Sequence, residues 1–219
     1  LHDCGYFENG QPARRNGYGV DFAQGAQGNV VKNNWIRDAF DEGVHFGSGS
    51  EGNRVIENTI ENNFNEQVYL LNTSDNQVKE NIITGGRISV FVDGANTNSV
   101  KENLGDRMLQ VRAGATLNQF KENTFRSVRF EQDATANEVK DGQIIGGNPC
   151  IQLRTGATGN VLRGVELVDC VSDIDARESG TNTLRDVNPL RPDKISVRDL
   201  AVVIVCNEGP NKCQKFTAP

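Results

Sequence analysis

The sequence predicts an all-β fold in which the chain winds as a single-stranded parallel β-helix, a solenoid of about eight to nine coils with a C-terminal cap. Two observations lead to this prediction. A phrase of the form Asn, x, apolar, x, x, Asn, x, apolar recurs along the chain. In addition, a short alternation of apolar and polar residues precedes most copies of this phrase.

The repeated phrase is clearest at residues 53–60, where Asn53, Val55, Asn58 and Ile60 occupy its fixed positions. The first asparagines of the successive copies are Asn29, Asn53, Asn76, Asn98, Asn118, Asn137, Asn160 and Asn182. Neighbouring members of this series lie 24, 23, 22, 20, 19, 23 and 22 residues apart. A period of this length is typical of stacked repeats in which each unit contacts only its neighbours.

Each unit contains two short apolar alternations, which we interpret as β-strands. One lies inside the asparagine phrase, and the other precedes it, as at Val44/Phe46 and Val128/Phe130. A turn rich in Gly, Ala, Asp and Thr separates the two. Without any helical period between them, strands this short fit two or three strands per coil, each paired in parallel with the next coil.

The second asparagines of the phrase are expected to stack on one another as an internal ladder of amides. Such a ladder would satisfy backbone groups buried at a corner of each coil. Its predicted members are Asn34, Asn58, Asn81, Asn103 and Asn123.

The pattern of coils is predicted to occupy residues 1–187, and residues 188–219 are predicted to form a C-terminal cap and tail. Residues 1–6 align with residues 31–36, with Cys4 in the place of Asn34. We therefore expect the sequence to begin in mid-coil, with further coils upstream in a longer protein. At the other end, Pro189 and Pro192 interrupt the repeat.

The five cysteines favour an oxidising, secreted or cell-surface location. Cys206 and Cys213 bracket a turn-like loop containing Gly209-Pro210, and we expect them to form a disulfide. Cys150 and Cys170 are about one coil apart. They can form a bridge or remain two buried thiols, and we favour the thiols. Cys4 is then left over.

Composition limits the classes of partner. The net charge of −6 argues against a general nucleic-acid-binding protein, and no apolar run is long enough for membrane insertion. The two histidines and the absence of a close Cys/His cluster argue against zinc. Carboxylates such as Asp38, Asp41 and Glu42 are of a type that binds calcium, but no dedicated calcium-loop signature is present, and we expect no cofactor or metal.

Stacked coils align outward side chains of the strand before the Gly-rich corner into rows. Counting back from each first asparagine, the eighth position holds Asp21, His45, Val68, Val90, Gln110, Arg129 and Gln152. The sixth position holds Ala23, Gly47, Leu70, Val92, Arg112, Glu131 and Arg154. The eleventh position, at the corner that leads into the strand, holds Tyr18, Glu42, Asn65, Arg87, Arg107 and Arg126.

These rows gather arginines on one face of an otherwise acidic protein. Their guanidinium groups suit the carboxylate or sulfate groups of an acidic polysaccharide. The alternative is an ordinary solvated set of ion pairs with Asp93, Asp106, Glu131 and Asp133. The predicted substrate-binding residues are Arg87, Arg107, Arg112, Arg126, Arg129 and Arg154.

The same rows place Asp21 beside His45, with Tyr18 at the same edge. These residue types can act as general acid and base, so Tyr18, Asp21 and His45 are the predicted catalytic residues.

The repeat resembles that of the right-handed, pectate-lyase-like parallel β-helix superfamily, which includes alginate lyases and mannuronan epimerases. The resemblance extends from residue 1 to about residue 187, and with the general handedness of parallel crossovers it implies a right-handed coil. Tyr18-Gly19-Val20-Asp21 is similar to the tyrosine–aspartate segment of mannuronan epimerases, although Phe22-Ala23 stands where that family has Pro-His. The resemblance implies a carbohydrate-active protein that binds an acidic polysaccharide, as a polyuronate lyase or epimerase-like enzyme. The alternative is a non-catalytic structural or adhesion module.

Overall fold

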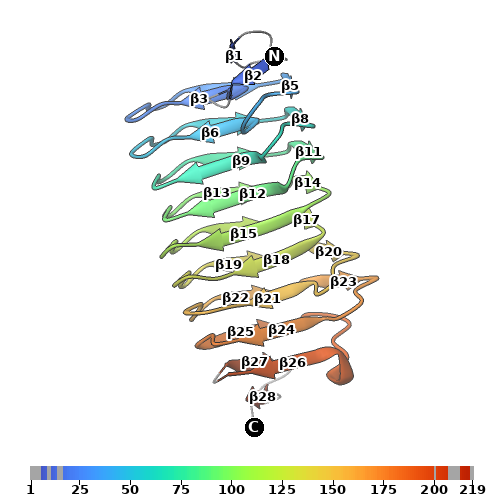
Figure 1. Ribbon diagram of the computed structural model, residues 1–219. Helices are drawn as coiled ribbons and strands as arrows, with labels where there is room; N and C mark the ends of the chain where they lie inside the picture. The colour runs from blue at the N-terminus through green and yellow to red at the C-terminus, as the bar shows by residue number, and fades with distance from the viewer. Residues whose placement is uncertain (1–5, 9–10, 14–16, 200, 207–212, 218–219) are drawn as a thin grey trace.

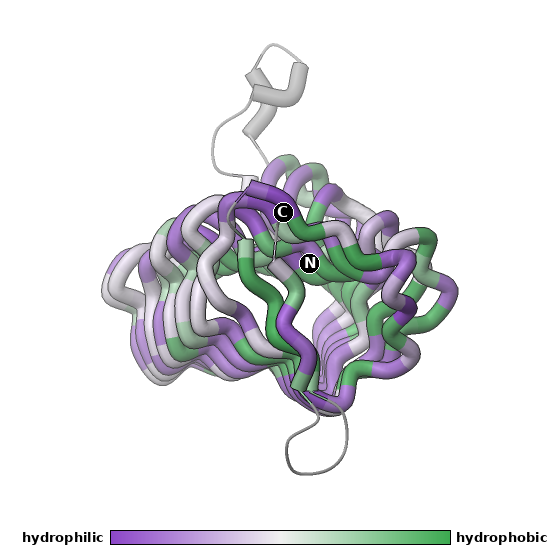
Figure 2. Tube along the Cα trace, turned by 90° about the horizontal axis from the view of Figure 1, so that it is seen from below, coloured by the Kyte–Doolittle hydropathy of each residue, from purple (hydrophilic) through white to green (hydrophobic). Residues whose placement is uncertain are grey.

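The computed structural model describes residues 6–8, 11–13, 17–199, 201–206 and 213–217 and shows a stack of coils (Figure 1). Each complete coil passes through three sheets, which contain ten, seven and nine strands and are parallel except for the last strand of the ten-stranded sheet. From a strand of the nine-stranded sheet, the chain crosses to the ten-stranded sheet and then to the seven-stranded sheet. Figure 2, viewed along the stack, shows successive coils superimposed in nearly one outline. The nine-stranded sheet agrees with the predicted eight to nine coils.

All strands of the stack are short. The nine-stranded sheet contains β3 (Val20–Phe22), β6 (Val44–Phe46), β9 (Glu66–Leu71), β12 (Ile88–Asp93), β15 (Met108–Arg112), β18 (Ser127–Phe130), β21 (Ile151–Leu153), β24 (Ile174–Arg177) and β26 (Ile195–Arg198). The ten-stranded sheet contains β4 (Val30–Lys32), β7 (Arg54–Ile56), β10 (Gln77–Lys79), β13 (Ser99–Lys101), β16 (Gln119–Lys121), β19 (Glu138–Lys140), β22 (Val161–Arg163), β25 (Thr181–Arg185), β27 (Val202–Cys206) and β28 (Cys213–Thr217). The seven-stranded sheet contains β5 (Trp35–Arg37), β8 (Thr59–Glu61), β11 (Ile82–Thr84), β14 (Leu104–Gly105), β17 (Thr124–Phe125), β20 (Gln143–Ile145) and β23 (Glu166–Val168).

The core runs along the inside of the stack as rows of equivalent apolar side chains. In the ten-stranded sheet, Val55 pairs with Val78 and Val78 with Val100, and all three are fully buried. Because side chains alternate between the two faces of a strand, each central apolar residue of these three-residue strands points inward. The flanking residues are then free to face solvent, which explains the alternating sequence pattern.

Two asparagine ladders, rather than the single predicted one, support the corners of the coils. In the predicted ladder, the backbone N–H and the side-chain Nδ2 of Asn58 donate to Oδ1 of Asn81 at 2.9 and 3.0 Å. The first asparagines form a second ladder of the same geometry, in which Asn53 donates twice to Asn76 at 2.9 and 3.1 Å. This second ladder extends from Asn29 to Asn182. Each amide thus satisfies backbone groups that water cannot reach.

The parallel stack continues beyond the two prolines near residue 190. After a single 3-10 turn, η1 (Pro192–Lys194), β26 pairs in parallel with β24, and β27 pairs in parallel with β25. The last strand, β28, returns antiparallel to β27, and the predicted disulfide between Cys206 and Cys213 joins the two strands. Near the N-terminus, β1 (Tyr6–Glu8) and β2 (Gln11–Ala13) form a separate antiparallel pair. The expected mid-coil position of Cys4 lies outside the described residues.

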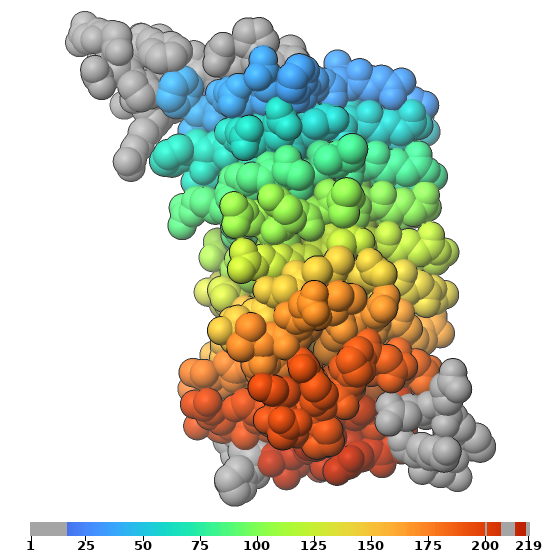
Figure 3. Space-filling model, turned by 90° about the vertical axis from the view of Figure 1, so that its right-hand side faces the viewer, coloured from blue at the N-terminus to red at the C-terminus, as the bar shows by residue number. Residues whose placement is uncertain are grey.

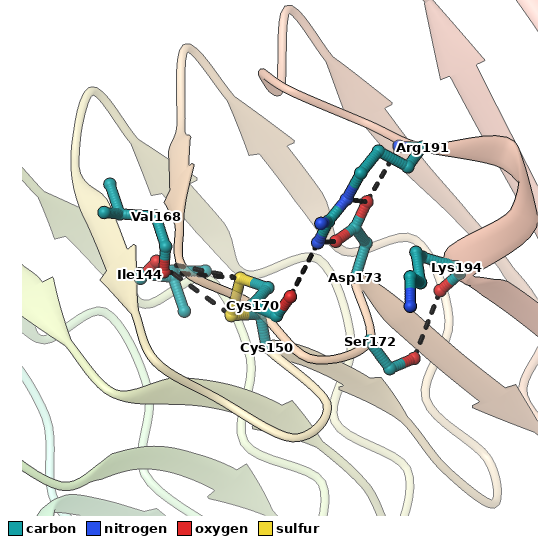
Figure 4. The surroundings of a disulfide bond; sticks show 8 residues. All are labelled: Ile144, Cys150, Val168, Cys170, Ser172, Asp173, Arg191 and Lys194. Atoms are coloured by element: carbon teal, nitrogen blue, oxygen red, sulfur yellow. Dashed lines mark hydrogen bonds and ion pairs between the residues drawn. A yellow bond between two sulfur atoms is a disulfide. The ribbon is translucent and has the colours of Figure 1, made fainter.

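The preference for two free thiols at Cys150 and Cys170 was wrong, because these residues form a disulfide (Figure 4). Their Cα atoms lie 5.7 Å apart in successive coils, which is within the range that a bridge requires. Both residues are buried, and the bridge joins the corners that follow β20 and β23. At the end of the corner that contains Cys170, the buried carboxylate of Asp173 accepts hydrogen bonds from the backbone N–H and the guanidinium of Arg191.

We expect Asn81→Ala to lower the free energy of unfolding by roughly 2–4 kcal/mol, because it removes the acceptor for two Asn58 donors and leaves buried carbonyls unpaired. Urea unfolding followed by circular dichroism measures this change. The matched control is Asn96→Ala at an exposed corner, where no large loss is expected. Equal losses for the two variants would contradict a structural role for the ladder.

Candidate functional site

The candidate site lies on the outward face of the nine-stranded sheet. Val44 and Phe46 are fully buried in the core, so the side chain of His45 between them points outward. The pairing of the strands places His45 in a row that runs along the whole sheet. We call this the central row, and its members are Asp21, His45, Tyr69, Phe91, Gln110, Arg129, Gln152, Asp175 and Ser196.

Two members of the central row differ from the sequence-based assignment. Val68 and Val90 were expected there, but both are fully buried, and Tyr69 and Phe91 take their places. The chain between the row and the next ladder asparagine is one residue shorter in these two coils than in the coil of His45. A slip of one residue exchanges the inward and outward faces of a strand. The apolar alternation within β9 and β12 was therefore a better guide than counting from the asparagines.

The structure brings Asp21, His45 and Tyr18 into direct contact. Nδ1 of His45 lies 2.9 Å from Oδ1 of Asp21. Because a carboxylate only accepts hydrogen bonds, Nδ1 carries the hydrogen and Nε2 is left as the basic nitrogen. The ring of Tyr18 stacks on the imidazole with the two centroids 4.4 Å apart. The imidazole is therefore oriented on two sides, as a general base requires.

A group of carboxylates lies beside this triad. Glu42 is only 7% exposed, and its burial raises its pKa to about 8, with further contributions from the charge of Asp41 and from the charge and hydrogen bond of Glu66. The Glu42 carboxyl therefore holds a proton at neutral pH. Burial and the charge of Glu42 also raise the pKa of Tyr18, which keeps its hydroxyl protonated. Sequence reasoning noted Glu42 and Asp41 but missed Glu66, because no pattern singles out one glutamate at the start of a strand.

Next to this group, Tyr69 and Phe91 form an aromatic pair. Their rings are nearly parallel, with centroids 4.9 Å apart. The hydroxyl of Tyr69 donates to Oδ2 of Asp93 at 3.0 Å, and Nη2 of Arg112 donates to the same oxygen at 3.0 Å. The guanidinium of Arg112 also covers the ring of Phe91 at 4.5 Å. Burial and the charge of Asp93 raise the pKa of Tyr69.

The three predicted arginines on this face are paired with acidic or amide groups. Besides Arg112, Arg129 donates from Nε to Gln152 at 3.0 Å and lies 3.9 Å from Glu131. Arg154 donates to Asp175 at 3.0 Å. Of the acidic partners named in the alternative interpretation, Asp93 contacts Arg112 and Glu131 lies near Arg129, whereas Arg154 pairs with Asp175. Each arginine remains partly exposed and can reach a ligand on the sheet.

The other three predicted arginines lie apart from this face, at the corners between the seven-stranded and nine-stranded sheets. Nη1 of Arg87 donates to Oδ1 of Asn65 at 3.3 Å, and Nε of Arg107 lies 4.0 Å from Asp106. Arg126 is exposed. The predicted basic set is thus divided between the sheet and its edge.

Within the described part of the chain, no three His, Cys, Asp or Glu side chains are grouped closely enough to hold a metal ion. In the same residues, no helix has the length and apolar character needed to cross a bilayer.

The raised pKa of Glu42 predicts a defined pH dependence of stability. The folded protein holds this proton up to a pKa of about 8, whereas the unfolded chain releases it near 4.5, so the free energy of unfolding falls as the pH rises between these values. Glu42→Gln imitates the protonated form and does not titrate. We expect the variant to match the wild type near pH 4.5 and to exceed its stability above pH 8, by roughly 2–4 kcal/mol.

Urea unfolding of both proteins across this pH range measures the difference. Glu51→Gln, at an exposed corner position, is the control, and its difference from the wild type should not change in this way. A difference between Glu42→Gln and the wild type that stays constant with pH would show that Glu42 titrates normally.

Solved structures that are similar to this chain include two that are described as catalytic or enzymatically active domains. The Agl-KA catalytic domain superposes with a TM-score of 0.72 and 15% identity, covering 86% of this chain and 45% of that one. The enzymatically active domain of bacteriophage CBA120 tailspike protein 2 gives a TM-score of 0.52 and 13% identity, covering 84% of this chain and 37% of that one. The chain thus spans less than half of either structure, and at these identities the likeness shows the fold.

No curated protein matches the sequence. One family model matches the sequence and supports the predicted right-handed parallel β-helix. The family model described as a right handed beta helix region matches residues 27–185, most of the chain, and the protein therefore belongs to the right-handed β-helix family.

Proposed function

We propose that the nine-stranded sheet binds an acidic polysaccharide lengthwise and that Tyr18, Asp21 and His45 transfer protons on it, as in a polyuronate lyase or epimerase. The observation that carries this proposal is the Asp21–His45 hydrogen bond with Tyr18 stacked on the imidazole, at one end of a long sheet face. The two similar structures, described as a catalytic domain and an enzymatically active domain, support an enzymatic role for this fold.

The chemistry of such a reaction matches the residue types present. Nε2 of His45 would remove the proton at C5 of the uronate, with Asp21 stabilising the imidazolium that forms. The hydroxyl of Tyr18, whose pKa is raised, would return a proton to the leaving oxygen or to the ring carbon. Both groups act from the same edge of the sheet, so one sugar can contact both.

The carboxylate of the substrate also has to be neutralised. The charged side chains grouped with His45 are acidic, and an ionised uronate would be repelled by Asp21, Asp41 and Glu66. Glu42 provides the missing donor, because its carboxyl is protonated at neutral pH and can share a hydrogen bond with the substrate carboxylate. Glu42 thus takes on the contact with the substrate carboxylate, which the sequence analysis gave to the arginines.

Binding along the rest of the sheet would use the aromatic pair and the arginines. Tyr69 is partly exposed, and Arg112, Arg129 and Arg154 offer guanidinium groups. The coils repeat at about 4.8 Å, which is close to the length of one sugar residue in a chain. A polysaccharide lying along the stack can therefore meet equivalent positions in successive coils.

A second candidate reaction is hydrolysis of a neutral polysaccharide. Glu42 holds a proton at neutral pH and Asp21 is a second carboxylate beside Tyr18, and glycoside hydrolases use one protonated and one ionised carboxyl group as acid and base or nucleophile. The two reactions give different products. A lyase forms an unsaturated sugar, whereas hydrolysis forms a new reducing end without unsaturation.

We also infer that the protein is secreted or lies on the cell surface. Cys150–Cys170 and Cys206–Cys213 are both bridged, and such bonds persist in oxidising compartments.

The test is an assay with polyuronates and with neutral glucans, following ultraviolet absorbance of unsaturated products and the release of reducing ends. We expect His45→Ala to lower kcat for unsaturated product by about 10²- to 10⁴-fold, because it removes the general base. Arg129→Ala should raise KM, because it removes a cation from the binding face. Glu42→Gln should retain lyase activity, because the amide still donates a hydrogen bond, but it should abolish hydrolysis.

The matched control is Arg163→Ala in the ten-stranded sheet, which removes an arginine of similar exposure that also pairs with a glutamate. Unsaturated product formation that is untouched by both His45→Ala and Arg129→Ala would overturn the proposed site. Binding of glycans without turnover of any would indicate a non-catalytic adhesion module.

A further inference from the structure

The corners between the seven-stranded and nine-stranded sheets differ in length along the stack. Only residues 106–107 separate β14 from β15, and only Arg126 separates β17 from β18. The corners on either side are longer: residues 62–65 follow β8, residues 146–150 follow β20, and residues 169–173 follow β23. In Figure 1 the corners after β20 and β23 project beyond those after β14 and β17. Figure 3 looks onto this side, where the orange C-terminal coils stand in front of the green and yellow coils.

A cavity of about 290 Å³ lies where the corners are short. Its apolar walls come from Leu104, Phe125 and Ile145, and its polar groups include Asp106 and Arg126. We call it the corner cavity. Leu104 is 53% exposed and Ile145 is 39% exposed, so a ligand in the cavity would cover apolar surface that faces solvent. The cavity is smaller than a typical drug-sized pocket, so its ligand is a small group.

Gly105 allows the cavity wall to form. A Cβ atom at this position would lie 2.7 Å from Cδ1 of Phe125, so only glycine leaves room for the phenyl ring. The ring then fills the space inside the coil and is 2% exposed. The buried ring therefore forms an apolar floor beneath the corner cavity.

The charged side chains around the corner cavity, Asp106, Arg107 and Arg126, carry a net positive charge. Both carboxylate oxygens of Asp106 accept the backbone N–H of Gly85, at 3.1 and 3.2 Å, and the same carboxylate lies 4.0 Å from Nε of Arg107. The guanidinium of Arg126 makes no hydrogen bond or ion pair within the described part of the chain. One uncompensated cation thus borders an apolar cavity.

We propose that the corner cavity binds a small organic anion with an apolar body, such as an aromatic or acyl carboxylate or sulfonate. Leu104, Phe125 and Ile145 contact the apolar body, and Arg126 pairs with the anionic group. The bound ligand covers the aliphatic side chains of Leu104 and Ile145, which supplies affinity. Its ion pair with the guanidinium of Arg126 supplies selectivity for anions. A plain uronate chain would leave the apolar walls uncovered, so this site is separate from the proposed polysaccharide face and does not depend on it.

The test uses fluorescence titration of the full chain with two probes of similar apolar size, the anionic anilinonaphthalene sulfonate and the neutral N-phenylnaphthylamine. We expect saturable binding of the anionic probe at one site. Arg126→Gln should raise its Kd by about threefold to tenfold and leave the Kd of the neutral probe unchanged. Ile145→Ser should weaken the binding of both probes, because it removes an apolar wall.

Controls of the same chemistry lie elsewhere on the surface. Arg163→Gln removes a partly exposed arginine of the ten-stranded sheet, and Leu117→Ser removes an aliphatic side chain that is 57% exposed. Neither should alter the binding of either probe. Thermal unfolding of each variant checks that it remains folded, because loosened proteins bind such dyes nonspecifically. Equal Kd values for wild type, Arg126→Gln and Ile145→Ser would overturn the proposal, as would equal binding of the neutral and anionic probes by the wild type.

Discussion

The pairing of each coil with the next is the constraint on which the remaining structure depends. Parallel strands bring equivalent residues of successive coils together, and the two asparagine ladders hold the corners in the same register. Asn58 illustrates the arrangement, since its amide donates to Val31 and Ile56 carbonyls and to Asn81 while its own Oδ1 accepts from Asn34. A polar side chain is buried here without an unpaired group, which keeps the corner rigid at little energetic expense.

The three corners of a coil are not equivalent, and this difference decides where chemistry can occur. The corner between the ten-stranded and seven-stranded sheets has the same length in coil after coil, with Glu57, Glu80, Glu102 and Glu122 all in the left-handed region at φ values of 54 to 57°. A ladder asparagine follows each of these residues. The corner between the seven-stranded and nine-stranded sheets has no ladder, and its length varies. Tyr18, Glu42 and the corner cavity all lie along this variable corner.

The sheet face beside this corner changes character along the stack. Its N-terminal coils bring Asp21, His45, Glu42 and Glu66 together, and burial makes one carboxyl protonated. Its middle coils bring together Tyr69, Phe91, Asp93 and Arg112 as one connected group of aromatic and charged side chains. A stack of nearly identical coils thus presents two different surfaces, because outward positions are free to vary while inward positions have to fill the core.

Much of the candidate site followed from the register of the repeat. Asp21 and His45 occupy equivalent positions of neighbouring coils, and their contact follows wherever coils of equal length stack. The same reasoning failed for Tyr69 and Phe91, because a corner one residue shorter moved each of them to the outer face. It also failed for Cys150 and Cys170, because a spacing of about one coil does not reveal how the Cβ atoms are directed.

The amino-acid sequence alone determined the solenoid, the core rows and the ladder positions, since these depend on a periodicity that is local and repeated many times. The tertiary structure alone decided the partners of each arginine, the raised pKa of Glu42 and the corner cavity. Those features depend on the distances between side chains of different coils and on how deeply each is buried. The variable corners set these distances and depths of burial. The spacing of the asparagines reports only the total length of each coil.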